Sequence, residues 1–161
     1  MFSILEMFKI GVGPSSSHTV GPMVAACKFV ESLEHTGTLG RVSRVRTVLY
    51  GSLALTGLGH GTDRATVAGL EGNMPQTVDT DHVNIIRHEC ESSGELLLAG
   101  KHRIDFDYAH DVVMDVWHRL AAHPNGMRFQ AFDQQNNLVD EQVWWRLCTA
   151  RQCRGSDDRH S

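Results

Sequence analysis

The sequence GMRFQAF (126–132), DQQNN (133–137) and LVDEQVWW (138–145) decides the fold class. Its two outer parts alternate apolar and polar side chains, which is the period of a half-buried strand, and its polar middle has the composition of a turn. Two such strands joined by a short turn form an antiparallel hairpin. Because helical patterns precede this hairpin, we expect a single α+β domain with a mixed, largely antiparallel sheet and helices packed on it.

A helical period fills residues 19–35. Apolar side chains recur there at helical spacing, namely Val20, Met23, Cys27 and Val30. Thr19 is a residue type that caps helix starts, and Gly37 is typical of a helix end. Cys27 lies on the apolar face, so we expect it to be a core residue.

Between this helix and the hairpin the pattern changes several times. We expect a helix at 62–70, capped by Thr62 or Asp63, and the glycine-rich stretch 51–61 before it cannot be one long regular helix. The β-branched, aromatic or alternating stretches predict strands at 42–50, 77–80 and 103–107, and the pattern of 81–91 is ambiguous.

Composition excludes several classes of protein. The 161 residues are 41% hydrophobic and 21% charged, which suits one globular domain with a core. A net charge of −4 without a basic cluster argues against nucleic-acid binding. The apolar runs are too short to span a bilayer, and the N-terminus does not have the pattern of a signal peptide. A cytoplasmic location is the resulting expectation.

The cysteines and lysines limit the cofactors. Four cysteines occur without a CxxC pair, so a disulfide framework is not expected. His82, His88 and Cys90 share no helix or strand face, and we therefore expect no metal site in this chain. None of the three lysines, Lys9, Lys28 and Lys101, lies in a motif typical of a pyridoxal phosphate Schiff base.

The segment GVGPSSSHT (11–19) ends at a predicted helix start. A helix N-terminus has unsatisfied N–H groups and a partial positive charge, so it favours a carboxylate or a phosphate. Serine hydroxyls and His18 would add hydrogen-bond donors. A flexible serine linker with an N-cap explains the residues about equally well. A P-loop does not, because its lysine is absent.

Two further segments carry histidines in turns. In GSLALTGLGHGTD (51–63), glycines flank His60, which leaves room for a ligand or another chain to approach it. In HPNGM (123–127), a turn precedes a strand, and His123 and Asn125 would stand at one end of the sheet. Taken alone, each segment is explained at least as well by an ordinary turn.

Together, FKIGVGPSSSHTVGPM, YGSLALTGLGHGTD and HPNGM resemble the N-terminal (beta) domain of the bacterial iron–sulfur L-serine dehydratases. The likeness runs from Met1 to about Val143. It implies conversion of L-serine to pyruvate and ammonia. It assigns His60 as the catalytic acid or base at the α-carbon. It also assigns substrate binding to Ser15, Ser16, Ser17, His18, Thr19, His123 and Asn125, the last two at the active site or at a regulatory site.

The resemblance also implies a [4Fe–4S] cluster, in which one iron acts as a Lewis acid on the substrate. In this family the ligands are cysteines of a C-terminal alpha domain, which is in cis or on a separate chain. A cluster with an open iron needs about three thiolates in one pocket. We therefore expect no cluster and no turnover in this chain alone.

Other functions stay open. A non-catalytic L-serine-binding regulatory module would show similar pocket segments, and a homodimer is compatible with either role. A phosphate or nucleotide binder is disfavoured by the missing P-loop lysine. A truncated remnant without function is the remaining alternative.

The tail departs from the family's pattern. We expect a beta-chain-like domain at 1–143 and an aberrant, disordered tail at 144–161, which would make Cys148 and Cys153 accidental. Trp144-Trp145-Arg146 read one base later gives Gly-Gly, and the family continues here with a glycine-rich stretch. We hypothesise a frameshift near Trp144, natural or from a sequencing error. An early stop in the +1 frame of the coding DNA would contradict it.

Overall fold

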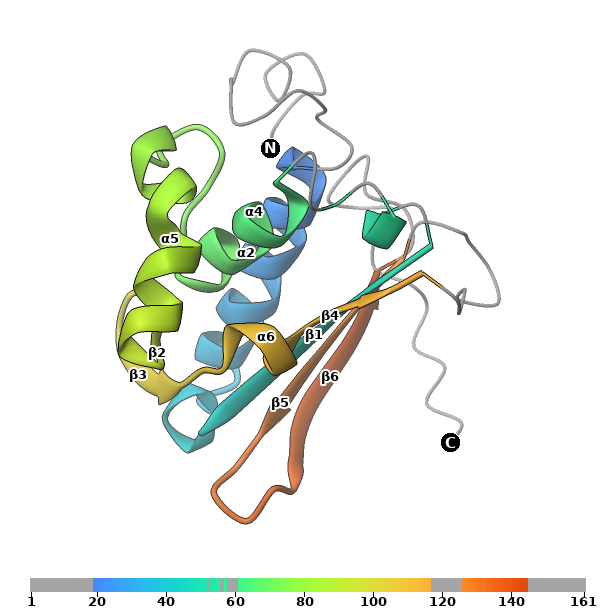
Figure 1. Ribbon diagram of the computed structural model, residues 1–161. Helices are drawn as coiled ribbons and strands as arrows, with labels where there is room; N and C mark the ends of the chain where they lie inside the picture. Colours follow the sequence, from blue (N-terminus) through green and yellow to red (C-terminus); the bar gives the residue numbers. More distant parts are fainter. Residues whose placement is uncertain (1–18, 52, 56, 58–60, 117–125, 145–161) are drawn as a thin grey trace.

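The computed structural model describes residues 19–51, 53–55, 57, 61–116 and 126–144 (Figure 1). In chain order its elements are α2 (Val20–His35), η1 (Leu39–Arg41), β1 (Arg44–Tyr50), α4 (Thr62–Leu70), α5 (Thr80–Ser93), β2 (Glu95–Leu98), β3 (His102–Asp105), α6 (Tyr108–Asp111), β4 (Val112–Asp115), β5 (Met127–Phe132) and β6 (Leu138–Trp144). The predicted α+β class, with a mixed and largely antiparallel sheet, is confirmed. No helix in the described ranges is long and apolar enough to cross a membrane.

Four strands form the main sheet in the order β4-β1-β5-β6. β1 pairs in parallel with β4 and antiparallel with β5, and β5 pairs antiparallel with β6. The predicted hairpin is therefore present, and its turn includes Asn136 in the left-handed region at φ 62°. A separate two-stranded hairpin, β2–β3, stands beside α5.

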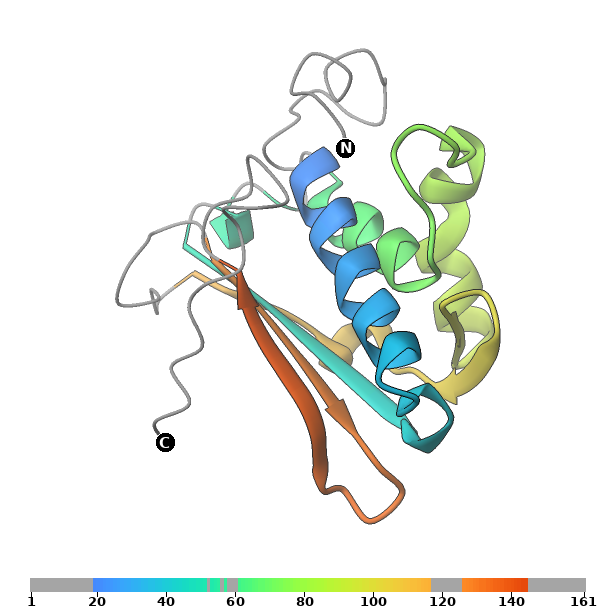
Figure 2. The same ribbon diagram turned by 180° about the vertical axis from the view of Figure 1, so that it is seen from behind.

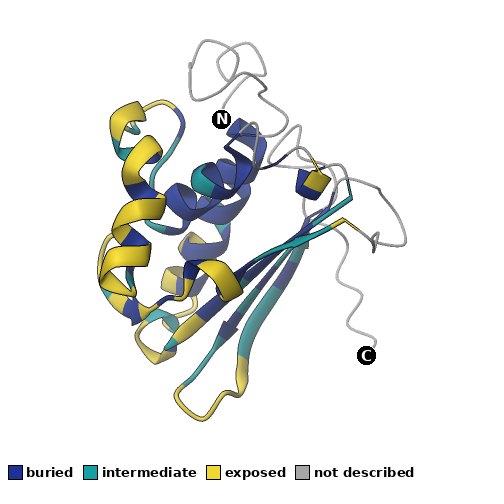
Figure 3. Ribbon diagram, viewed as in Figure 1, coloured by how far each residue is buried: buried dark blue, intermediate teal, exposed yellow. Residues whose placement is uncertain are grey.

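The helices cover one face of the main sheet (Figures 1 and 2). Val45, Thr47 and Leu49 alternate toward this face from β1, as the period of a strand requires. Phe29 of α2 stacks on Phe129 of β5 with ring centroids 5.2 Å apart. α2 is buried along most of its length, whereas the outer side of α5 is exposed (Figure 3).

α4 crosses α2 at a glycine. A Cβ placed on Gly69 would overlap the carbonyl oxygen of Met23 and lie 2.8 Å from the Cβ of Ala26. The two helices thus approach more closely than any side chain at position 69 would allow. This close approach buries Val67, Ala68 and Leu70 of α4 in the shared core.

The structure corrects several predicted elements. The strand expected at 77–80 is wrong, because Asp79 caps α5 through its side chain and Thr80 is the first residue of that helix. The ambiguous stretch 81–91 belongs to α5. β3 begins one residue earlier and ends two residues earlier than the strand expected at 103–107.

Four expectations concern the ends of elements. Gly37 ends α2 with φ 73°, as expected. Thr19 occupies the N-cap position, but its side chain makes no capping hydrogen bond. The cap predicted at Thr62 or Asp63 is wrong, because the N-cap of α4 is Gly61. Trp144 is a buried residue of β6, one residue beyond the boundary expected at 143.

Substituting Gly69→Ala should lower the free energy of unfolding by about 1–3 kcal/mol, since the added methyl group must push α2 and α4 apart. Urea unfolding followed by circular dichroism measures the change. Gly40→Ala is the matched control, because a Cβ there meets nothing within 4 Å. Equal stability of the two variants would contradict the close crossing.

Candidate functional site

The segments that lead to His60 and His123 leave the described fold at one end of the main sheet. β1 and β4 are parallel and end together, with Tyr50 opposite Asp115. The Gly51 N–H donates to the carbonyl of Asp115 at 3.2 Å, and the Tyr50 N–H donates to the carbonyl of Gly126 at 2.9 Å. The end of β1, the end of β4 and the entry to β5 are therefore hydrogen-bonded neighbours.

Helix starts lie at this same end. α2 begins at the same end of the molecule, although its start is set apart from the ends of β1 and β4 in both views (Figures 1 and 2). Gly57 lies between the start of α4 and the end of β4. A Cβ placed on it would overlap the side chain of Met114 in β4 and lie 3.4 Å from the Cβ of Thr62, the first residue of α4. The start of α4 thus lies near the end of β4. We call this end of the fold, with the ends of β1 and β4 and the starts of α2, α4 and β5, the upper end.

Most residues with a predicted role lie outside the described ranges. These are Ser15, Ser16, Ser17, His18, His60, His123 and Asn125. Thr19 is described: it is 1% exposed and directly precedes α2. Gly61, the residue after His60, has φ 75°, a left-handed conformation that favours glycine.

A buried polar pair near the start of α4 was not predicted. The Tyr108 hydroxyl donates to Asp63 Oδ2 at 2.7 Å, and both side chains are almost fully buried. Arg87 lies over the Tyr108 ring at 5.3 Å from its centroid, and Phe106 meets that ring edge-on. The pair ties the first turn of α4 to the element that precedes β4. No local pattern indicates it, because its two members are 45 residues apart.

Substituting Tyr108→Phe should lower the free energy of unfolding by about 1–3 kcal/mol, because the buried Asp63 carboxylate loses a hydrogen-bond donor. Burial, and next the charge of Asp63, raise the pKa of Tyr108, so the folded state favours the neutral phenol. The stability that the neutral Tyr108 phenol contributes is complete below the pKa of tyrosine in the unfolded chain, about 10. It is lost as the pH rises from that value toward the raised pKa of Tyr108 in the folded chain.

Urea unfolding between pH 7 and 11 measures both effects. Tyr50→Phe, in a half-buried tyrosine at the end of β1, is the control. If Tyr108→Phe matched this control in stability, and kept the alkaline loss of the parent chain, the buried pair would have no energetic role.

Two cysteines belong to the core. Cys27 and Cys90 are buried, as expected for Cys27. Burial raises the pKa of the Cys27 thiol to about 11 and that of Cys90 to about 12. Iron–sulfur ligation needs thiolates, and the described ranges contain no group of three histidine, cysteine or carboxylate residues that could hold a metal ion. The described residues therefore do not fit a [4Fe–4S] cluster.

At pH 8, Cys27 and Cys90 of the folded chain should react with iodoacetamide at least about tenfold more slowly than in urea, because burial disfavours the thiolate. Peptide mapping by mass spectrometry resolves the two sites. Equal rates in folded and unfolded chains would show that neither thiol is protected.

Comparison with known proteins decides the family. The family model for the serine dehydratase beta chain matches residues 3–148. The chain belongs to the serine dehydratase beta-chain family. An L-serine dehydratase of Helicobacter pylori is 44% identical over 146 residues, which are 91% of this chain and 31% of that protein. One from Streptomyces coelicolor is 46% identical over 90% of this chain and 32% of its own length.

A third relative, L-serine dehydratase 1 of Escherichia coli, is 46% identical over 83% of this chain and 29% of its own length. The beta-chain domain described here thus spans about a third of the curated relatives that it matches. The family matches the resemblance found in the sequence.

Proposed function

We propose that this chain is the substrate-pocket part of an L-serine ammonia-lyase, which converts L-serine to pyruvate and ammonia. The observation that carries the proposal is the upper end. There the His60 segment and the His123 segment attach to neighbouring residues, and the predicted serine–histidine segment precedes α2, which starts at the same end of the fold (Figure 1). Attachment points at one end of the fold support a shared ligand site for segments that are far apart in sequence.

The proposed roles follow from the attachment points. Ser15, Ser16, Ser17, His18 and Thr19 precede α2, whose N-terminal N–H groups favour the substrate carboxylate. His60 takes or returns the proton at the α-carbon, a step for which an imidazole suits neutral pH. His123 and Asn125 precede β5 and bind the remaining polar groups of L-serine.

The [4Fe–4S] cluster belongs, in this proposal, to the part of the relatives that this chain does not span. Cys27 and Cys90, the only cysteines among the described residues, are both buried in the core, which supports that assignment. The alpha domain that would hold the cluster is the proposed partner.

His60→Gln should lower pyruvate formation from L-serine by roughly 10²–10⁴-fold, the usual effect of losing a general acid or base. The assay is anaerobic and uses this chain mixed with a cluster-reconstituted alpha domain of the family. His88→Gln, on the exposed side of α5, is the matched control. Calorimetry of each variant with L-serine separates binding from chemistry.

The outcomes separate the candidate functions. Activity of the mixture that His60→Gln abolishes, with L-serine binding retained, supports the proposal. L-serine binding without activity in any mixture favours the regulatory module instead. If the chain shows neither L-serine binding nor activity, both functions are contradicted, and the chain is a truncated remnant without function.

A further inference from the structure

The face of the main sheet that points away from the helices has no covering element among the described ranges (Figures 1 and 2). Side chains alternate between the two faces of a strand, and Val45, Thr47 and Leu49 of β1 point toward the helices. The residues between them, with their partners in the neighbouring strands, point to the other face, which we call the open face. Its central residues are Arg46, Val48, Arg128, Gln130, Glu141 and Val143.

A charged row crosses the open face. The strand registers place Arg46 of β1 beside Gln130 of β5, and Gln130 beside Glu141 of β6. Glu141 accepts from Gln130 Nε2 at 2.7 Å and from Arg128 Nη1 at 3.2 Å. Two strand spacings, about 10 Å, separate the backbones of Arg46 and Glu141. The row therefore has its positive end on β1 and its negative end on β6.

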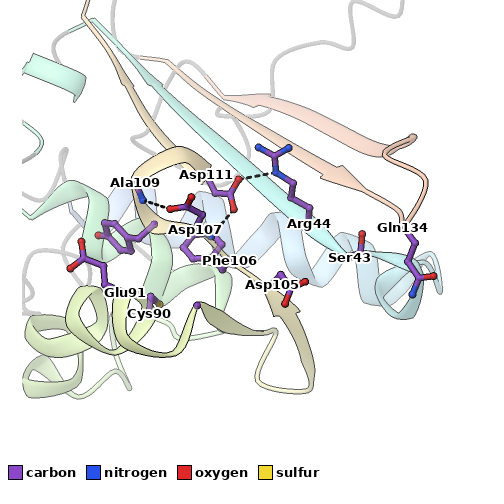
Figure 4. Close-up of a pocket in the computed structure, with 12 residues that line it drawn as sticks. Ser43, Arg44, Cys90, Glu91, Asp105, Phe106, Asp107, Ala109, Asp111 and Gln134 are labelled. Carbon is purple, nitrogen blue, oxygen red and sulfur yellow. Dashed lines mark hydrogen bonds and ion pairs between the residues drawn. The ribbon is translucent and has the colours of Figure 1, made fainter.

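Arg46 is the arginine of this face that lacks a partner. Nε of Arg44 donates to Asp111 Oδ1 at 2.8 Å (Figure 4), and Arg128 pairs with Glu141. Arg46 is half-buried, yet it makes no ion pair or side-chain hydrogen bond with any residue that the structure describes. Nε of Arg128 is also buried without a hydrogen-bond partner. Half-buried donors without partners cost free energy, so they favour an acceptor from another molecule.

An apolar row lies next to the charged row. Val48 of β1 is beside Val113 of β4 and Arg128 of β5, and Arg128 is beside Val143 of β6. Val48 is only 5% exposed, whereas Val113 and Val143 are partly exposed. The aliphatic stem of an arginine adds to such a surface. The row can therefore pack against the apolar row of another sheet.

We propose that the open face binds the open face of a second copy of this chain, with the two-fold axis between the sheets and parallel to β5. Such an axis places β1 of one copy over β6 of the other at the same level along the strands. Arg46 then meets Glu141 of the second copy, and Val48 meets its Val143. The contact is isologous, so each pair forms twice. An axis across the strands through the charged row would instead oppose Arg46 to itself, and like charges repel.

The size of the open face predicts a reversible dimer. Three strands about 4.8 Å apart and about 23 Å long give a flat contact of roughly 300 Å² per copy. Stable interfaces bury about 800 Å² per partner, so this dimer should dissociate on dilution. The upper end is not part of the open face, so the inference does not depend on the proposed function.

Sedimentation velocity of the chain between roughly 10 μM and 1 mM tests the dimer. The chain should dimerise as its concentration rises, and added salt should weaken the dimer. Arg46→Glu should weaken it by at least about tenfold, because the substitution replaces two attractive pairs by two repulsive ones. Arg103→Glu is the matched control, since the side chain of Arg103 is 64% exposed on β3 and pairs with Glu95 of its own hairpin.

The double variant Arg46→Glu, Glu141→Arg tests the pairing itself. It exchanges the two charges, so it should dimerise like the parent chain, and circular dichroism checks that it folds. If the double variant does not fold, Val143→Lys decides the test. It places an unpaired charge on the open face without removing a partner of Glu141, and it should weaken the dimer at least as much as Arg46→Glu.

Three results would overturn the proposal. The first is a chain that stays monomeric over the whole concentration range. The second is a dimer that Arg46→Glu and Val143→Lys leave unchanged, or a folded double variant that stays monomeric. The third is a monomer whose Arg46→Glu variant loses activity with the alpha domain but still binds L-serine, which would assign the open face to the alpha domain.

Discussion

The structure depends on how tightly α2 is held between the main sheet and α4. On one side Phe29 stacks on Phe129, and on the other Gly69 lets α4 approach the backbone of α2. Burial of α2 along most of its length follows from contact on both sides (Figure 3). An added methyl group at position 69 would disturb this arrangement more than a larger change on the exposed side of α5.

This packing fixes where the functional segments attach. Because β1, β4 and β5 are hydrogen-bonded at the upper end and α4 starts near β4, the residues that flank the His60 and His123 segments are neighbours in space. The Tyr108–Asp63 hydrogen bond also stabilises the upper end, because it joins the first turn of α4 to α6, the element before β4. The opposite end of β1 borders a separate polar groove, whose lining includes Arg44 and Asp105.

Elements with a clear period were predictable from the sequence, and pairings between distant residues were not. The helix at 19–35, the strand at 42–50 and the final hairpin are close to α2, β1 and β5–β6. β4 was missed, because a four-residue edge strand with a short apolar run has no distinctive period. Thr77–Thr80 was misassigned, since threonine and valine favour strands while Asp79 favours a helix start. The Tyr108–Asp63 pair depends on tertiary structure alone.

A crystal structure of the chain with L-serine would test the central claim most directly. The account predicts L-serine at the upper end, with its carboxylate at the N-terminus of α2 and with His60, His123 and Asn125 in contact with it. A structure in which these residues lie far apart, or in which L-serine binds without any of them, would contradict the account.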